Sequence, residues 1–141
     1  MNVRRATEAD VEAARRLWEA SNEEITFTPY EGSSFDPALV SDHIALIAED
    51  DGGEIAGVVY ANAASPDYGF VFGLFVRPDA RRRGVARLLM RAVASELRES
   101  GRRYVVLSVD TPNEAARHLY DKLGFVDAAR TLRVEIDRLV S

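Results

Sequence analysis

The sequence contains no cysteine, a single lysine and only two histidines. Without cysteine the chain forms no disulfide, no thiolate metal site and no covalent intermediate on a thiol. No apolar run approaches the length of about 18 residues that a membrane span needs, and Met1–Arg5 is too polar and too short for a secretory signal. These absences favour a cytoplasmic protein with no metal and no membrane partner.

The 141 residues, of 15.6 kDa, predict a single domain over residues 1–141. A content of 47% hydrophobic and 29% charged residues is typical of a globular protein. The net charge of −5 is unevenly distributed: residues 1–76 carry 4 basic and 14 acidic residues, and residues 77–141 carry 14 and 9. Such asymmetry indicates either partners of opposite charge or drift of surface residues.

The first half of the sequence predicts an antiparallel arrangement. Two apolar runs flank the residues Asp51, Gly52 and Gly53, which is the pattern of a β-hairpin. Asp36 and Pro37 suit the start of a short helix. The elements expected in this half are a strand at 3–5, a helix starting after Thr7, a short helix from Asp36 to His43, and hairpin strands within 44–50 and 54–64.

The second half alternates strands and helices, which is typical of parallel pairing. The run "YGFVFGLFV", residues 68–76, predicts a strand buried on both faces. An amphipathic helix follows from Val85 to Leu97, ended by Gly101. A buried strand "YVVLSV", a helix over Asn113–Leu123 and a last strand within Thr131–Leu139 complete the series. The expected fold class is α/β with a mixed sheet: antiparallel N-terminal strands, a central parallel pair and flanking helices.

The stretch "RPDARRRGVARLL", residues 77–89, places three arginines before a glycine where that helix begins. Helix starts leave backbone N–H groups unpaired and carry partial positive charge, so they bind anions. Gly84 lets a phosphate approach the main chain closely. The spacing matches neither of the common glycine-rich nucleotide loops. Taken alone, the stretch is equally well explained as a basic turn between a strand and a helix.

Together with "NEAARHLYDKLGF", residues 113–125, this stretch resembles the GNAT family of N-acetyltransferases. The acyl-CoA loop of that family, Q/R-x-x-G-x-G/A, is matched by Arg81, Gly84 and Ala86. The resemblance spans residues 68–125 and implies the GNAT-type acyl-CoA N-acyltransferase fold. The second family motif, N-x-x-A-x-x-L-Y-x-K-x-G-F, is matched by Asn113, Ala116, Leu119, Tyr120, Lys122, Gly124 and Phe125.

The resemblance implies acetyl-CoA as co-substrate. Its pantetheine would pair with the main chain of Leu74–Val76, and its pyrophosphate would accept N–H bonds from the loop and helix start. Gly73 suits a bulge that separates the two parallel strands in this family, and close packing explains it almost as well. Asn113 would orient the cofactor or cap its own helix. The residues expected at the cofactor are Leu74, Phe75, Val76, Arg81, Arg82, Arg83, Gly84, Val85, Ala86, Arg87 and Asn113.

The implied reaction is direct attack of an amine on the thioester. By its place in the family motif, Tyr120 matches the proton donor to the leaving thiolate. An unperturbed phenol, of pKa about 10, keeps its proton at pH 7 and so has one to donate. The alternative is a tyrosine that only packs its helix. Many relatives place a glutamate on the strand before the loop, but residues 70–76 contain no acid. The base is therefore left open among Glu23, Glu24, Glu31, His43 and Asp110.

The resemblance places part of the acceptor pocket within Ser21–Phe35, whose aromatic residues are Phe27, Tyr30 and Phe35. The acidic first half favours a small cationic amine as acceptor. A protein or peptide amine is second, since Ser108 stands where protein N-terminal acetylases often carry a glutamate. A non-catalytic acyl-CoA-binding regulatory module is a further alternative. Nucleic-acid binding is disfavoured by a pI near 5.1, and a homodimer is left open.

Overall fold

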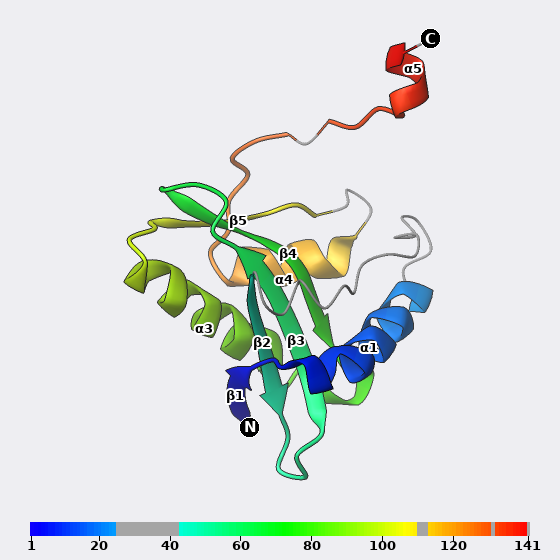
Figure 1. The fold of residues 1–141 in the computed structure, drawn as a ribbon, viewed down its shortest axis with the longest axis vertical. Coiled ribbons are helices and arrows are strands. Elements are labelled where there is room, and N and C mark those ends of the chain that lie inside the picture. The colour runs from blue at the N-terminus through cyan, green and yellow to red at the C-terminus, as the bar shows by residue number, and fades with distance from the viewer. Residues whose placement is uncertain (25–42, 110–112, 131, 141) are drawn as a thin grey trace. The chain divides into compact units, whose positions relative to one another are not determined.

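The structure is a computed structural model that describes residues 1–24, 43–109, 113–130 and 132–140 (Figure 1). The chain forms two compact units, Met1–Leu107 and Ser108–Ser141. The short helix expected from Asp36 lies outside the described residues. None of the helices in the described ranges has the length and apolar character that crossing a membrane requires.

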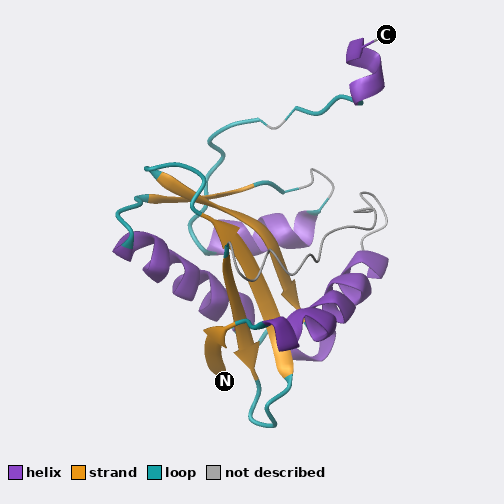
Figure 2. Cartoon of the chain, in the orientation of Figure 1, coloured by secondary structure: helices purple, strands orange, loops and turns teal. Residues whose placement is uncertain are grey.

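The first unit is built on a five-stranded sheet with the strand order β1-β2-β3-β4-β5 (Figure 2). The first four strands pair antiparallel, and β5 runs parallel to β4, so the predicted mixed sheet is confirmed. The β2–β3 turn is held by Asp50, whose side chain accepts the N–H groups of Gly52 and Glu54 at 3.0 Å each. The strands are β1 Asn2–Arg5, β2 Ile44–Glu49, β3 Ile55–Asn62, β4 Tyr68–Val76 and β5 Tyr104–Leu107.

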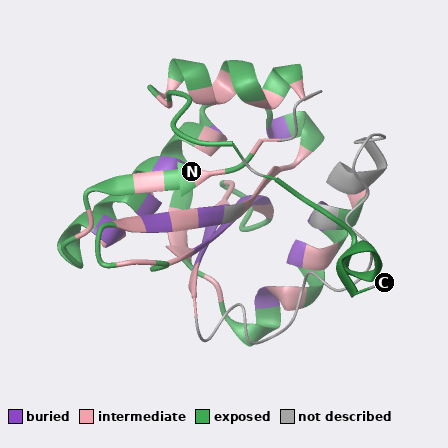
Figure 3. Ribbon diagram, turned by 90° about the horizontal axis from the view of Figure 1, so that it is seen from above, coloured by how far each residue is buried: buried purple, intermediate pink, exposed green. Residues whose placement is uncertain are grey.

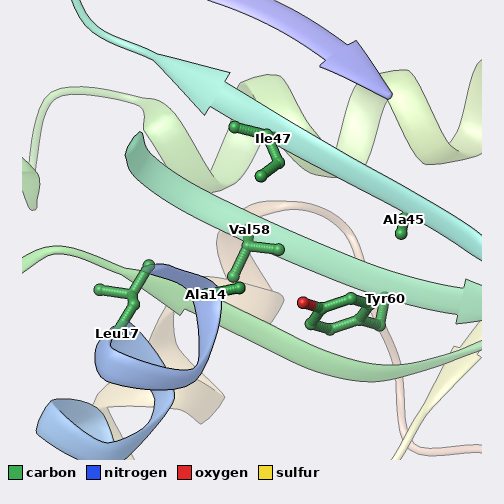
Figure 4. Packing of buried hydrophobic residues seen from close by; sticks show 6 residues of the cluster. All are labelled: Ala14, Leu17, Ala45, Ile47, Val58 and Tyr60. Atoms are coloured by element: carbon green, nitrogen blue, oxygen red, sulfur yellow. The ribbon is translucent and has the colours of Figure 1, made fainter. Parts of the chain in front are cut away.

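Two helices, α1 (Val11–Glu24) and α3 (Val85–Glu99), cover opposite faces of the sheet (Figure 1). On the α3 face, a Cβ at Gly57 would lie 2.9 Å from Val85, so the helix contacts the bare backbone of β3. The next residue, Val58, points to the other face because side chains alternate along a strand. There α1 packs on a buried cluster of Ala14, Leu17, Ala45, Ile47, Val58 and Tyr60 (Figure 4).

The spacing of apolar residues in α3 explains its position. Buried residues recur every four positions from Val85 to Leu97, with Met90 beside them. In the sheet, burial is concentrated on the central strands (Figure 3). Leu88, which precedes the buried Leu89, lies beside this stripe of buried residues and is 37% exposed. The helix ends before Gly101, whose φ is 87°, as predicted. The buried residues of α3 are Val85, Leu89, Met90, Val93 and Leu97.

The prediction that the fifth strand is buried is wrong. The side chains of Tyr104 and Val106 are exposed, at 53% and 37%. The cause is the position of β5, which lies at the edge of the sheet with β4 as its neighbour. An apolar run does not by itself distinguish an edge strand from a central one.

The last strand predicted within Thr131–Leu139 is also wrong for the described residues. Residues 132–135 are irregular, and Ile136–Val140 forms the short helix α5. Its apolar residues Ile136, Leu139 and Val140 have helical spacing, and Asp137 lies in the first turn, where negative charge is favourable.

Among the described residues of the first unit, Asp10 is charged and yet buried, with 8% of its surface exposed. Its carboxylate accepts two hydrogen bonds from the Arg4 guanidinium, both at 2.8 Å, and one from the Thr7 N–H at 2.7 Å. Arg4 also pairs with Glu49. The hydrogen bond from Arg4 is the main cause that lowers the pKa of Asp10 from 3.8 to about 2.

Replacing Asp10 with asparagine is therefore expected to lower the free energy of unfolding by about 2 kcal/mol at pH 7. A lowered native pKa stabilises the fold above pH 3.8, and this contribution is lost as the pH falls towards 2. Urea unfolding at pH 7 and near pH 2.5 measures both effects. The exposed Asp51 is the control, for which Asp51→Asn should change stability by less than about 0.5 kcal/mol. Equal stability of wild type and Asp10→Asn at pH 7 would contradict the expectation.

Candidate active site

β4 pairs with β5 along only part of its length. Parallel pairing extends from Tyr68 and Tyr104 to Val71 and Leu107. Opposite β3 the register passes from Gly73 directly to Val71, so residue 72 forms a bulge next to the glycine expected to mark one. Beyond the bulge, β4 continues with β3 on one side and no described strand of the first unit on the other. Within the described part of the first unit, the end of β4 is thus an open sheet edge.

The main-chain groups of Leu74 and Val76 point to this open edge. In an antiparallel pair, successive residues point their N–H and C=O groups alternately towards and away from the partner strand. The Arg77 N–H donates to a β3 carbonyl oxygen at 2.8 Å, so the groups of Phe75 also point towards β3. At the open edge, Arg81 Nε donates to the Val76 carbonyl at 3.1 Å. Leu74 therefore offers an N–H and a C=O in the geometry that an added strand would use.

A tight loop carries β4 into α3. The loop consists of the 3-10 turn Pro78–Ala80 and a turn over residues 81–84. Arg82 and Gly84 have positive φ angles of 64° and 80°. A Cβ on Gly84 would meet no atom within 4 Å, so the space above this residue is open.

The start of α3 is suited to an anion. Gly84 is the N-cap and contributes no side chain, and the first turn contains no acidic residue. The N–H groups at such a start, next to residues with left-handed backbone, attract negative charge. Val85 is buried, so it could contact a ligand only through its main chain. The side chains of Arg81, Arg82, Arg83 and Arg87 are exposed around this start.

Arg77 anchors the beginning of the loop, a role that the sequence did not indicate. Its guanidinium donates to the carbonyl oxygen of Ile55 and to the carboxylate of Asp50, at 3.1 Å each. It also pairs with Asp79 within the loop. These contacts tie the loop to the β2–β3 hairpin, and only the folded sheet brings the partners together.

The other predicted residues lie in the second unit, on α4 (Glu114–Lys122). Asn113 is the N-cap of this helix, and its side-chain oxygen accepts the Ala116 N–H at 3.1 Å. The capping alternative is therefore observed. The cap uses only the side-chain oxygen of Asn113. The side-chain nitrogen can still contact the cofactor, and this contact stays a prediction.

Tyr120 lies in the last turn of α4, where the helix ends in a Schellman motif. The Gly124 N–H donates to Asp121 at 3.1 Å and the Phe125 N–H to Tyr120 at 3.0 Å. Gly124 has a φ of 96°, which a residue without a side chain adopts at little cost. The rings of Tyr120 and Phe125 meet edge to face, with centroids 5.5 Å apart and planes at 67°. The spacing of the L-Y-x-K-x-G-F motif thus has a local structural cause.

The first unit brings together Leu74, Val76 and the loop residues 81–87, whereas the second holds Asn113 and Tyr120 on one short helix. Among the base candidates, His43 begins the segment before β2 and is half-buried. Glu31 and Asp110 lie outside the described residues, as do the aromatic residues Phe27, Tyr30 and Phe35 and the side chains of Glu23 and Glu24.

A sequence model of the acetyltransferase (GNAT) family matches residues 6–125. The chain belongs to this family. The expected family, and with it membership in a family of acetyltransferases, is confirmed. The match spans every residue of β2 to α4 and includes both motifs from which the resemblance was drawn.

Curated relatives of this GNAT protein are named for different activities. Mycothiol acetyltransferase of Rhodococcus jostii is 45% identical over 60 residues, which are 43% of this chain and 20% of that protein. The L-amino acid N-acyltransferase MnaT of Escherichia coli is 27% identical over 108 residues, 71% of this chain and 60% of that protein. The chain thus covers between a fifth and three fifths of these relatives.

Solved structures confirm the fold. Ard1 of Thermoplasma volcanium has a TM-score of 0.77 and 26% identity over 91% of this chain and 84% of that chain. The aminoglycoside N-acetyltransferase AAC(6')-Iy, solved in complex with CoA, has a TM-score of 0.72 and 25% identity over 95% and 98%. The mixed α/β fold expected from the sequence is therefore that of GNAT acetyltransferases.

Proposed function

We propose that this GNAT protein transfers the acetyl group of acetyl-CoA directly to a primary amine. The observation that carries the proposal is the open edge of β4 at Leu74–Val76, which leads within a few residues to the helix start at Gly84. An extended arm can pair along this edge while its pyrophosphate lies at the helix start. The solved complex of AAC(6')-Iy with CoA supports CoA as the ligand of this fold.

The main chain supplies the binding and electrostatic part of the mechanism. When bound, acetyl-CoA provides the thioester that an amine can attack. The Leu74 N–H, fixed by strand pairing and pointing to the open edge, stabilises negative charge on the thioester oxygen. The loop N–H groups around Gly84 hold the pyrophosphate, each such bond to a charged group contributing about 1.5–3 kcal/mol.

Tyr120 donates the proton that the leaving thiolate requires. A positioned general acid typically accelerates a reaction by about 10²–10⁴-fold. The chain has no cysteine to carry the acyl group, in keeping with direct transfer. The acceptor's ammonium group must lose a proton before the resulting amine can attack, and residues 70–76 of β4 contain no acid that could take this proton.

A small cationic amine is the proposed acceptor. The first 76 residues carry 14 acidic and 4 basic side chains, which attract a cation. Aminoglycosides, the substrates named for AAC(6')-Iy, are amines of this kind. The relative MnaT is named an L-amino acid N-acyltransferase, so amino acids are an acceptor class to be compared with cationic amines.

A panel of acceptors tests this proposal, with product masses as the readout. Wild-type protein is incubated with acetyl-CoA and, separately, with polyamines, an aminoglycoside, amino acids and short peptides. We expect cationic small amines to gain the mass of one acetyl group, and the rate of this acetylation to be well above the rate for neutral amines. Acetylation of peptide N-termini alone would replace the acceptor class, and acetyl-CoA binding with no product would favour a regulatory module.

A further inference from the structure

Two contacts join Phe125 to Tyr120 where α4 ends. The main-chain N–H of Phe125 donates to the Tyr120 carbonyl at 3.0 Å, and the two rings meet edge to face at 5.5 Å. Both side chains are half-buried. In a Schellman motif the two residues at these positions frequently share an apolar contact, and here both carry aromatic rings.

This contact selects one orientation of the phenol. A tyrosine inside a helix has two accessible χ1 rotamers, near 180° and −60°. A change between them swings the ring to another side of the helix and gives up the contact with Phe125. An edge-to-face pair is favoured over separated rings, so the orientation of Tyr120 that keeps this ring contact is stabilised by its neighbour.

We propose that Phe125 is a positioning residue for Tyr120, holding its hydroxyl in the single orientation that proton donation uses. The effect on turnover rests on the proposed function, whereas the held rotamer is a property of the helix end itself. A general acid must come within hydrogen-bond reach of the group that it protonates. A displacement of about 1 Å can cost about 10²-fold in rate, so a phenol divided between two rotamers is a weaker acid catalyst.

A double-mutant cycle tests the catalytic part. Phe125→Leu should lower kcat about three- to tenfold with the KM for acetyl-CoA unchanged, and Phe125→Tyr, which keeps a ring, should retain wild-type kcat. In the Tyr120→Phe background, Phe125→Leu should have no further effect on kcat, because its target is gone. Equal losses in both backgrounds would overturn the proposal, as would a lowered Tm with unchanged kcat.

The rotamer is measured directly by NMR on protein with labelled tyrosine, the Tyr120 signals being assigned by their loss in Tyr120→Phe. Side-chain couplings should report one χ1 rotamer in wild type and averaging in Phe125→Leu. A single unchanged rotamer in Phe125→Leu would overturn the proposal whether or not the protein is an acetyltransferase. If that variant unfolds, Phe125→Met keeps apolar volume without a ring and decides the same question. Absence of amine-dependent turnover in wild type would instead refute the proposed function and leave this measurement valid.

Discussion

Turnover with a saturating amine falls at least about tenfold when Tyr120 is replaced with phenylalanine, while the affinity for acetyl-CoA stays within about twofold. The substitution removes only the hydroxyl, so the ring contact with Phe125 and the end of α4 are kept. The expected loss arises because the thiolate then leaves without a positioned proton donor. Initial rates of CoA release and calorimetric titration with acetyl-CoA measure the two quantities.

Tyr104→Phe is the matched control for this experiment. Tyr104 lies on the edge strand β5 with half of its surface exposed, and it belongs to no part of the proposed site. Its loss of a hydroxyl should leave turnover and affinity unchanged. Unchanged turnover in Tyr120→Phe as well would remove this phenol from the mechanism and assign Tyr120 to packing.

Gly84→Glu is expected to weaken the binding of acetyl-CoA by at least about tenfold. The new side chain projects into the open space above the loop, where no atom lies within 4 Å of a Cβ, and brings a negative charge to the place proposed for the pyrophosphate. Two causes therefore add: the carboxylate repels the phosphates, and its bulk separates them from the main-chain N–H groups. Calorimetric titration with acetyl-CoA gives the dissociation constant.

Gly84→Ala is the control that separates the effects of the glutamate's charge and bulk on binding from the effect of backbone strain. Both variants force a side chain onto a residue with a φ of 80°, so both should lose a similar, small amount of thermal stability. Only the glutamate variant should lose most of its affinity. Wild-type affinity in a folded Gly84→Glu protein would contradict the assignment of this loop to the cofactor.

Local patterns were sufficient to predict the β2–β3 hairpin of the sheet and the helix α3 that covers one of its faces. The hairpin followed from Asp51, Gly52 and Gly53 between two apolar runs, and α3 from apolar residues at helical spacing ended by Gly101. Each of these signals is contained in a few neighbouring residues. The edge position of β5 was missed because exposure depends on which strands lie beside it, and a run such as "YVVLSV" contains no such information.

The features of the candidate site likewise divide into those that local sequence patterns predicted and those that only the folded chain brings together. Motif spacing located the loop before α3 and the helix that carries Tyr120. Gly73 within an apolar strand suggested either a bulge or close packing, and the bulge lies beside it. The ion pair of Arg77 with Asp50 joins residues 27 positions apart, so no local pattern revealed it. The partnership of Tyr120 and Phe125 had a usable signal, since a glycine followed by an apolar residue after a helix is typical of the Schellman motif.

The release of CoA thiol from acetyl-CoA, followed with a thiol-reactive dye, tests the central claim most directly. The protein has no cysteine, so it contributes no signal of its own. The account predicts that release depends on an added amine, saturates with its concentration and equals the amount of acetylated amine formed. Release no faster than spontaneous hydrolysis with every amine tested, by protein that demonstrably binds acetyl-CoA, would contradict it.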